Sequence, residues 1–249
     1  MKEKIDLINK IFTWFYYNNN HHFFSHKEPT SVAKPEYIPS SKNMNIDYVN
    51  MKNNELYEKI SSNTVEDLKK EIEDFDGCSL KNTATNMVFS DGNSKANVMV
   101  IGEAPGEEED RTGKPFKGQA GILLDKMLNA IGQNRDNTYI SNIIFWRPPG
   151  NRNPTEEEIN ICLPFVFKHI EIIKPKVLIL AGAIAAKAIL NDNKGIIQLR
   201  GNWHSLNIAN KSIKAMPIYH PAFLLRQPSR KREAWEDLKK IKKEIDLIT

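Results

Sequence analysis

The chain has 249 residues, 40% of them hydrophobic, and a formal net charge of +4, which is enough for one full hydrophobic core with an appendage. It contains no apolar run of bilayer length and no leader-like start with a small-residue cleavage site, so we expect neither a membrane protein nor a secreted one. The mild positive charge permits binding to nucleic acid without requiring it.

The first sixty residues divide into two segments of different composition. Residues 1–17 carry apolar side chains at helical spacing, which predicts an amphipathic helix. Residues 18–60 are rich in Asn, Ser and Lys without periodicity, which is typical of a partly disordered linker. The sequence leaves open whether this arm docks on the core, binds a partner or only tethers. A folded domain is predicted over 61–249, beginning with a helix over 64–75.

Apolar strand patterns and helical patterns alternate through the rest of the chain. The predicted strands are 97–102, 138–145, 176–182 and 214–220. The predicted helices between and after them are 122–132, 156–174 and 183–191. This order predicts an α/β fold of three layers, in which helices cover both faces of a central, mainly parallel four-stranded sheet. A last helix over 230–244 has mixed charge, and we expect most of it to face solvent.

Unusual residues follow the predicted strands. The turn Gly102–Gly106 ends the first strand, Asn142 lies near the end of the second, and His220 ends the fourth. Because ligands of open α/β sheets bind beyond the carboxyl ends of the strands, we expect these residues to share one site. The run Glu107–Asp110 would repel a phosphate, and the turn lacks the GxGxxG spacing, which argues against a dinucleotide cofactor.

Four motifs along the chain resemble, in order, those of the uracil-DNA glycosylase superfamily. They are GEAPGEEEDRTGKPFKGQAGILLDKML, YISN, RPPGNRNPTEEEINIC and YHPAFLLRQPS. The chain is most similar to the fourth family, the iron–sulfur-containing thermostable type, from roughly Cys78 to the C-terminus. The resemblance implies a monofunctional, monomeric enzyme that flips uracil out of DNA, hydrolyses its N-glycosidic bond and leaves an abasic site.

The resemblance also implies roles for individual residues. The Asn142 carboxamide offers the donor and acceptor that read the N3–H and O4 edge of uracil, Phe116 stacks on the base, and His220 donates to uracil O2 as negative charge develops there. The alternative for each is structural: a strand-end cap, a core phenylalanine and a packed histidine. The predicted lining of the base pocket is completed by Gly102, Ala104, Pro105 and Gly106.

The residue that activates the attacking water is not marked by the motifs. Related families with a GQDPYH-like motif place an aspartate third in the turn, and here that position is Ala104. Glu103, Glu109 and Asp110 remain candidates for orienting either water or the pocket backbone. Glu107 and Glu108 are interpreted as solvated side chains near a helix start.

Contacts to the DNA backbone are predicted downstream of the turn. Backbone N–H groups at Gln119, Ala120 and Gly121 would bind a phosphate at a helix start. Lys117 stands where the family has a small apolar residue, so it is either a phosphate contact or a plain surface lysine. The other predicted backbone contacts are Arg152, Arg226 and Ser229.

The cysteines depart from the family. Two cysteines are too few for a disulfide framework and fit a reducing cytoplasm, where we expect the protein to lie near the nucleoid. The family holds a four-iron, four-sulfur cluster on four cysteines. Cys78 and Cys162 match two of these, whereas Phe75 and Trp146 replace the others. A cubane cluster needs four ligands, so we predict no metal or cofactor and expect apolar packing in its place.

Two other functions stay open at this level. The same scaffold could prefer another base, such as hypoxanthine or a mismatched base, or it could be a catalytically silent DNA-binding module. The Asn142 carboxamide and Phe116 favour uracil, and an intact set with His220 argues against the silent module.

Overall fold

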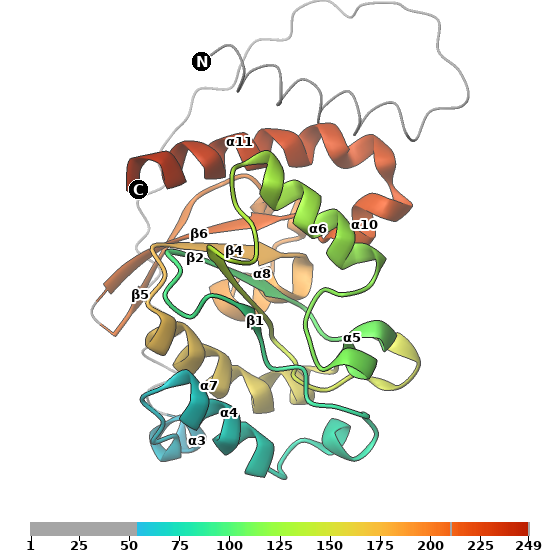
Figure 1. The fold of residues 1–249 in the computed structure, drawn as a ribbon, viewed down its shortest axis with the longest axis vertical. Coiled ribbons are helices and arrows are strands. Elements are labelled where there is room, and N and C mark those ends of the chain that lie inside the picture. Colours follow the sequence, from blue (N-terminus) through green and yellow to red (C-terminus); the bar gives the residue numbers. More distant parts are fainter. Residues whose placement is uncertain (1–53, 210, 249) are drawn as a thin grey trace, which may run out of the picture. The chain divides into compact units, whose positions relative to one another are not determined.

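The computed structural model describes residues 54–209 and 211–248. The predicted helix over 1–17 and all but the end of the predicted linker lie outside the described residues. Six strands form one sheet in the order β1-β3-β2-β4-β6-β5 (Figure 1). They are β1 Asp91–Gly92, β2 Val98–Gly102, β3 Thr138–Asn142, β4 Val177–Ala181, β5 His204–Ile208 and β6 Lys211–Ile218.

The four predicted strands are the four central, mutually parallel strands of this sheet, which confirms the predicted α/β class. The predicted strand count is wrong, because β1 and β5 add an antiparallel strand at each edge. Strand β1 is two residues long, too short to show a pattern, and β5 alternates only partly between buried and exposed side chains. Strand β3 also stops at Asn142, three residues before the predicted end.

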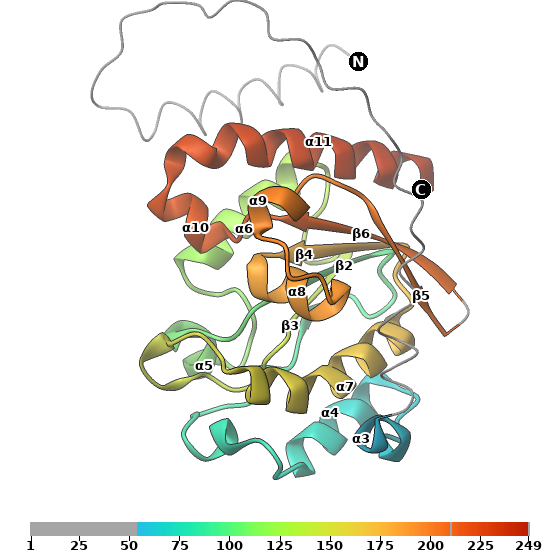
Figure 2. The same ribbon diagram turned by 180° about the vertical axis from the view of Figure 1, so that it is seen from behind.

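Helices cover both faces of the sheet. Helix α6 lies in front of the sheet in Figure 1 and behind it in Figure 2, and α8 does the reverse. The described helices are α3 Glu55–Lys59, α4 Val65–Asp74, α5 Glu107–Thr112, α6 Gln119–Ala130, α7 Glu156–Ile173, α8 Ala183–Leu190, α9 Ile196–Leu199, α10 Pro221–Arg226 and α11 Lys231–Ile248. The three-layer arrangement predicted from the alternating pattern is therefore present.

Local capping explains where several of these helices begin. The Thr64 side chain accepts a hydrogen bond from Asp67 N and starts α4, as predicted. Helix α7 starts with a capping box between Thr155 and Glu158. Helix α3 occupies the end of the segment predicted as linker, where Asn54 caps it and Tyr57 is buried. Helix α3 was not predicted because its five residues are too few to show a helical period.

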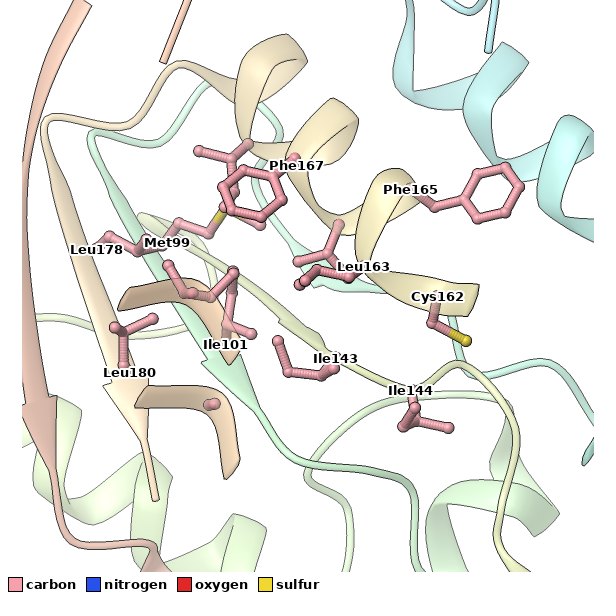
Figure 3. Close-up of a cluster of buried hydrophobic side chains, with 14 of the residues drawn as sticks. Met99, Ile101, Ile143, Ile144, Cys162, Leu163, Phe165, Phe167, Leu178 and Leu180 are labelled. Atoms are coloured by element: carbon pink, nitrogen blue, oxygen red, sulfur yellow. The ribbon is translucent and has the colours of Figure 1, made fainter. Parts of the chain in front are cut away.

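The main core lies between the sheet and α7 (Figure 3). Met99 and Ile101 of β2 and Leu178 and Leu180 of β4 point to this face, together with Phe167 of α7. All residues of β2 and β4 are buried, so both faces of these strands are covered. Continuous apolar strands therefore fold into the centre of the sheet, which fixes where their carboxyl ends lie.

Helix α11 leaves most of its residues at least partly exposed, as its charge pattern predicts, and buries one face. Leu238, Ile241 and Ile245 are buried at helical spacing. Buried Asp237 accepts hydrogen bonds from Arg200 at 2.8 Å and 2.5 Å. The mixed charge thus covers only the outer side of the helix. None of the described helices is long and apolar enough to cross a membrane.

One histidine is buried within α7. His169 is 1% exposed, its Nε2 lies 2.6 Å from the Tyr139 hydroxyl, and its ring stacks on Phe89 at a centroid distance of 4.6 Å. Burial lowers the pKa of His169 to about 3. The folded protein therefore holds this imidazole neutral.

We predict that His169 makes the fold sensitive to acid. In the unfolded chain its pKa returns to about 6.5, so unfolding takes up a proton below that pH and the free energy of unfolding falls as pH decreases. Between pH 7.5 and pH 5 this group should remove roughly 2 kcal/mol. Urea denaturation of wild type and His169→Phe at both pH values measures this, and an equal pH dependence in the two proteins would contradict the prediction.

Candidate active site

The carboxyl ends of β2 and β3 meet at one pair of residues. Gly102 and Asn142 are the last residues of the two strands and lie opposite each other in register. Ile143 N donates to Gly102 O at 2.9 Å, which holds the two segments together just beyond the end of β3. Asn142 is 2% exposed. Its carboxamide offers a hydrogen-bond donor and an acceptor at the carboxyl ends of the two strands, which suits it to bind a polar ligand.

Gly102 brings this carboxamide next to the predicted stacking residue. A Cβ at Gly102 would lie 2.4 Å from Asn142 Oδ1 and 2.5 Å from Phe116 Cζ, both impossible contacts. The glycine is therefore required for Asn142 and Phe116 to occupy these positions. The sequence placed Gly102 in the pocket, and the structure supplies the steric reason.

The Phe116 ring faces the ring of His220. Their centroids are 5.6 Å apart and the planes differ by 26°. His220 follows β6, and Gly182 at the end of β4 approaches it so closely that a Cβ there would lie 3.0 Å from His220 Cβ. Gly182 has a φ of +103°, which side chains disfavour. Residues after four strands thus converge on one site, as the topology predicted.

His220 is held as a neutral hydrogen-bond donor. Its Nδ1 accepts from Ala222 N at 3.1 Å at the start of α10, which leaves the proton of the neutral ring on Nε2. Burial, with a smaller contribution from the positive charge of Arg226, lowers the pKa of His220 to about 4. Near pH 7 the ring can therefore donate through Nε2–H without carrying charge.

Glu109 binds backbone on two sides of the site. Its Oε2 accepts from Gly106 N at 3.0 Å, and its Oε1 accepts from Lys117 N at 2.7 Å and Gly118 N at 2.8 Å. Of the two roles that the sequence left open for Glu109, the geometry supports orientation of the pocket backbone. Asp110 likewise binds backbone, accepting from Thr85 N at 2.8 Å.

Glu103 is the remaining carboxylate beside the pocket. Its side chain has no hydrogen-bond partner within the part of the chain that the structure describes. Burial raises the pKa of Glu103 above its usual range, and the charge of nearby Arg226 offsets part of this shift. Ala104 packs against the hydrophobic core and contributes no polar group to the turn.

The predicted DNA contacts separate into two groups. Gln119, Ala120 and Gly121 form the first turn of α6, against which α10 packs. Arg226 ends α10, and exposed Ser229 lies in the following 3₁₀ turn. These five residues therefore belong to neighbouring elements beside the pocket.

Two predicted contacts already bind other residues of the chain. Arg152 forms a bidentate pair with Glu158 at 2.9 Å and 2.6 Å. Lys117 Nζ lies 2.8 Å from Asp91 Oδ2. Pairing within the protein leaves each cation less available for a phosphate.

Arg135 lies outside the sequence-predicted set, yet it contacts the backbone of the site. It donates to Pro115 O at 3.1 Å and to Phe116 O at 2.5 Å. No motif marks Arg135, because its partners lie far from it in the sequence.

The residues at the family's cluster positions do not fit a four-thiolate site. The buried thiols of Cys78 and Cys162 interact: a hydrogen bond from Cys162 lowers the pKa of Cys78 to about 7, and the same bond raises that of Cys162. Phe75 packs edge-on against Phe165 at 4.9 Å, and Trp146 is 3% exposed. Over residues 54–209 and 211–248, no three metal-ligating side chains gather.

Comparison with known proteins agrees with this geometry. The family model described as Uracil DNA glycosylase superfamily matches residues 89–239. The chain belongs to this superfamily. A type-4 uracil-DNA glycosylase of Archaeoglobus fulgidus is 39% identical over 182 residues, which cover 72% of this chain and 92% of that protein. A type-4 enzyme of Thermotoga maritima is 41% identical over 171 residues, 66% of this chain and 86% of that protein.

A more distant relative is also similar. A type-5 uracil-DNA glycosylase of Pyrobaculum aerophilum is 30% identical over 146 residues, which cover 53% of this chain and 63% of that protein. The superfamily match spans the stretch that holds Gly102, Phe116, Asn142 and His220. The family membership predicted from the four motifs is thereby confirmed.

We predict that Gly102→Ala removes glycosylase activity. The new methyl group must displace the Asn142 carboxamide or the Phe116 ring, and a misplacement of about 1 Å can cost roughly 100-fold in rate. Gly195→Ala is the matched control, because nothing lies within 4 Å of a Cβ there. Release of base from a uracil-containing oligonucleotide measures the effect, and equal rates for the two variants would refute the steric argument.

Proposed function

We propose that the chain is a monofunctional uracil-DNA glycosylase, which hydrolyses the N-glycosidic bond of uracil in DNA and leaves an abasic site. The observation that carries this proposal is the gathering of Asn142, Phe116 and His220 around the side-chain-free position at Gly102. Type-4 relatives with this activity in their names support it. The base must leave the DNA stack to reach such a buried set.

Base recognition follows from two side chains. The Asn142 carboxamide donates one hydrogen bond and accepts another, which matches the O4 acceptor and N3–H donor of uracil. Cytosine presents the reverse pattern on this edge, so it is mismatched to a carboxamide held in the orientation that suits uracil. The Phe116 face contributes stacking, worth about 1–3 kcal/mol per base.

His220 stabilises the leaving group. When the glycosidic bond breaks, its electron pair moves into uracil and negative charge develops on O2, while the sugar gains oxocarbenium character. The neutral Nε2–H of His220 donates to this oxygen. Loss of one such donor typically costs about 3–4 kcal/mol.

Water attacks the sugar carbon that the base has left, and the proton that it loses neutralises the departed uracil anion, so the products are an abasic sugar and neutral uracil. We assign its orientation to Glu103, because Glu109 is engaged with three backbone N–H groups. The oxocarbenium-like sugar is a strong electrophile, so this water needs only weak activation.

We place the contacts to the DNA backbone on α6, on α10 and on the turn that follows α10. The N–H groups at the start of α6 bind a phosphate, and Arg226 and Ser229 extend this contact. Arg152 and Lys117 are secondary in this proposal because of their pairs with Glu158 and Asp91. We propose a monomer that acts on uracil-containing DNA in the cytoplasm, at the nucleoid, with the folded domain over 61–249 as its catalytic part.

The first test is base excision on oligonucleotides that contain uracil, hypoxanthine or a mismatched thymine, read as strand cleavage at the abasic site. We expect release of uracil, with His220→Ala slowing the reaction roughly 100- to 1,000-fold. Asn142→Ala should reduce uracil release and weaken discrimination against cytosine.

His204→Ala on the edge strand β5 is the matched control and should keep the wild-type rate. Release of hypoxanthine but not uracil would change the assigned substrate. Binding to DNA without release of any base would indicate a silent module.

We further propose that the protein carries no iron–sulfur cluster. Two interacting thiols, with Phe75 and Trp146 at the other two positions, cannot supply four ligands. Packing of Phe75 against Phe165 of α7 and burial of Trp146 hold the same loops in place of the cluster.

We predict that protein purified without oxygen contains no stoichiometric iron and shows no visible-range absorbance of an iron–sulfur cluster. Trp146→Ala should instead destabilise the fold by roughly 3–5 kcal/mol in urea denaturation, since Trp146 is 3% exposed and its removal leaves a cavity. Stoichiometric iron would overturn the proposal.

A further inference from the structure

The segment that carries Phe116, residues 115–118, has an unusual backbone. Phe116 has a φ of +55°, a left-handed conformation that bulky residues seldom adopt. Such a conformation persists only where surrounding contacts hold it. Helix α6 lies so close to this segment that a Cβ at Gly121 would be 1.8 Å from Phe116 O.

Ions of opposite charge hold this segment on its two sides. The Glu109 carboxylate accepts from Lys117 N and Gly118 N, the amides that follow Phe116. The Arg135 guanidinium donates to Pro115 O at 3.1 Å and Phe116 O at 2.5 Å, the carbonyls before and at the ring. Each peptide group next to the Phe116 side chain is therefore fixed.

Arg135 is itself held rigidly. Its Nη1 lies 2.7 Å from Asp91 Oδ2, and its Nε lies 2.9 Å from Asp125 Oδ1. The Arg135 and Asp91 side chains are only 19% and 17% exposed, so their pair is largely removed from water, whereas the Asp125 side chain is 41% exposed. A planar guanidinium can bind two carboxylates and two carbonyls at once, which a lysine ammonium cannot do in this geometry.

We propose that Arg135 is a positioning residue for base excision, which holds the Phe116 ring where it stacks on the flipped base. The inference rests on the proposed function. Arg135 lies at the end of the α6–β3 connection and binds the backbone of the Phe116 segment, so its effect passes through Phe116. Asp91 links it to β1, the edge strand that the sequence pattern did not reveal.

A double-mutant cycle tests this path. Arg135→Met should lower kcat/KM for a uracil-containing oligonucleotide roughly 10- to 100-fold, about as much as Phe116→Ala. In the Phe116→Ala protein, adding Arg135→Met should change the rate less than about threefold, because the ring to be positioned is gone. Arg111→Met, which removes an exposed pair with Glu108 on α5, is the matched control and should keep the wild-type rate.

A second measurement does not depend on activity. NMR contacts between the ring protons of Phe116 and His220 should be present in wild type and Arg111→Met and lost in Arg135→Met. The proposal is overturned if Arg135→Met keeps these ring contacts, or if it slows the Phe116→Ala protein by the same factor as wild type. If wild type releases no uracil, the proposed function fails, and the ring contacts alone decide the role of Arg135.

Discussion

The candidate active site depends on a single close approach, that of Gly102 to Asn142 and Phe116. The two strands end in register at Gly102 and Asn142, and the missing side chain leaves the only room for the carboxamide and the ring. A buried, fully covered β2 fixes where Gly102 lies. Burial of the central strands therefore determines the dimensions of a polar site that lies beyond their ends.

Carboxylates in the turn after β2 organise backbone. Glu109 and Asp110 are buried, and the carboxylate of each accepts hydrogen bonds from backbone N–H groups of nearby loops. A buried carboxylate would be costly without such partners. The acidic run that argued against a phosphate site thus supports the loops around the proposed base pocket, beside which Glu103 keeps an open carboxyl group.

In the protein without a cluster that we propose, the same loops are fixed in a different way. A cluster would join its four ligand positions by bonds to iron, whereas this chain has aromatic rings at two of those positions and interacting thiols at the other two. Apolar packing is less directional than ligation, but it needs no iron and no oxygen protection. Cys78 is 1% exposed and Cys162 is 0% exposed, so both pack as small buried side chains.

The sequence by itself determined the four central strands, the flanking helices and most of the rim, because periodicity and caps are local properties of the chain. It also predicted that Gly102, Asn142 and His220 share one rim, since parallel strands share the edge where they end, whereas Phe116 was assigned to that rim by the resemblance of its motif. Only the tertiary structure decided the partners of Glu109 and Arg135, the pairs that occupy Arg152 and Lys117, and the two edge strands. Arg135 and Asp91 are 44 residues apart in the sequence. Only folding brings them into contact, so no local sequence pattern can predict their pair.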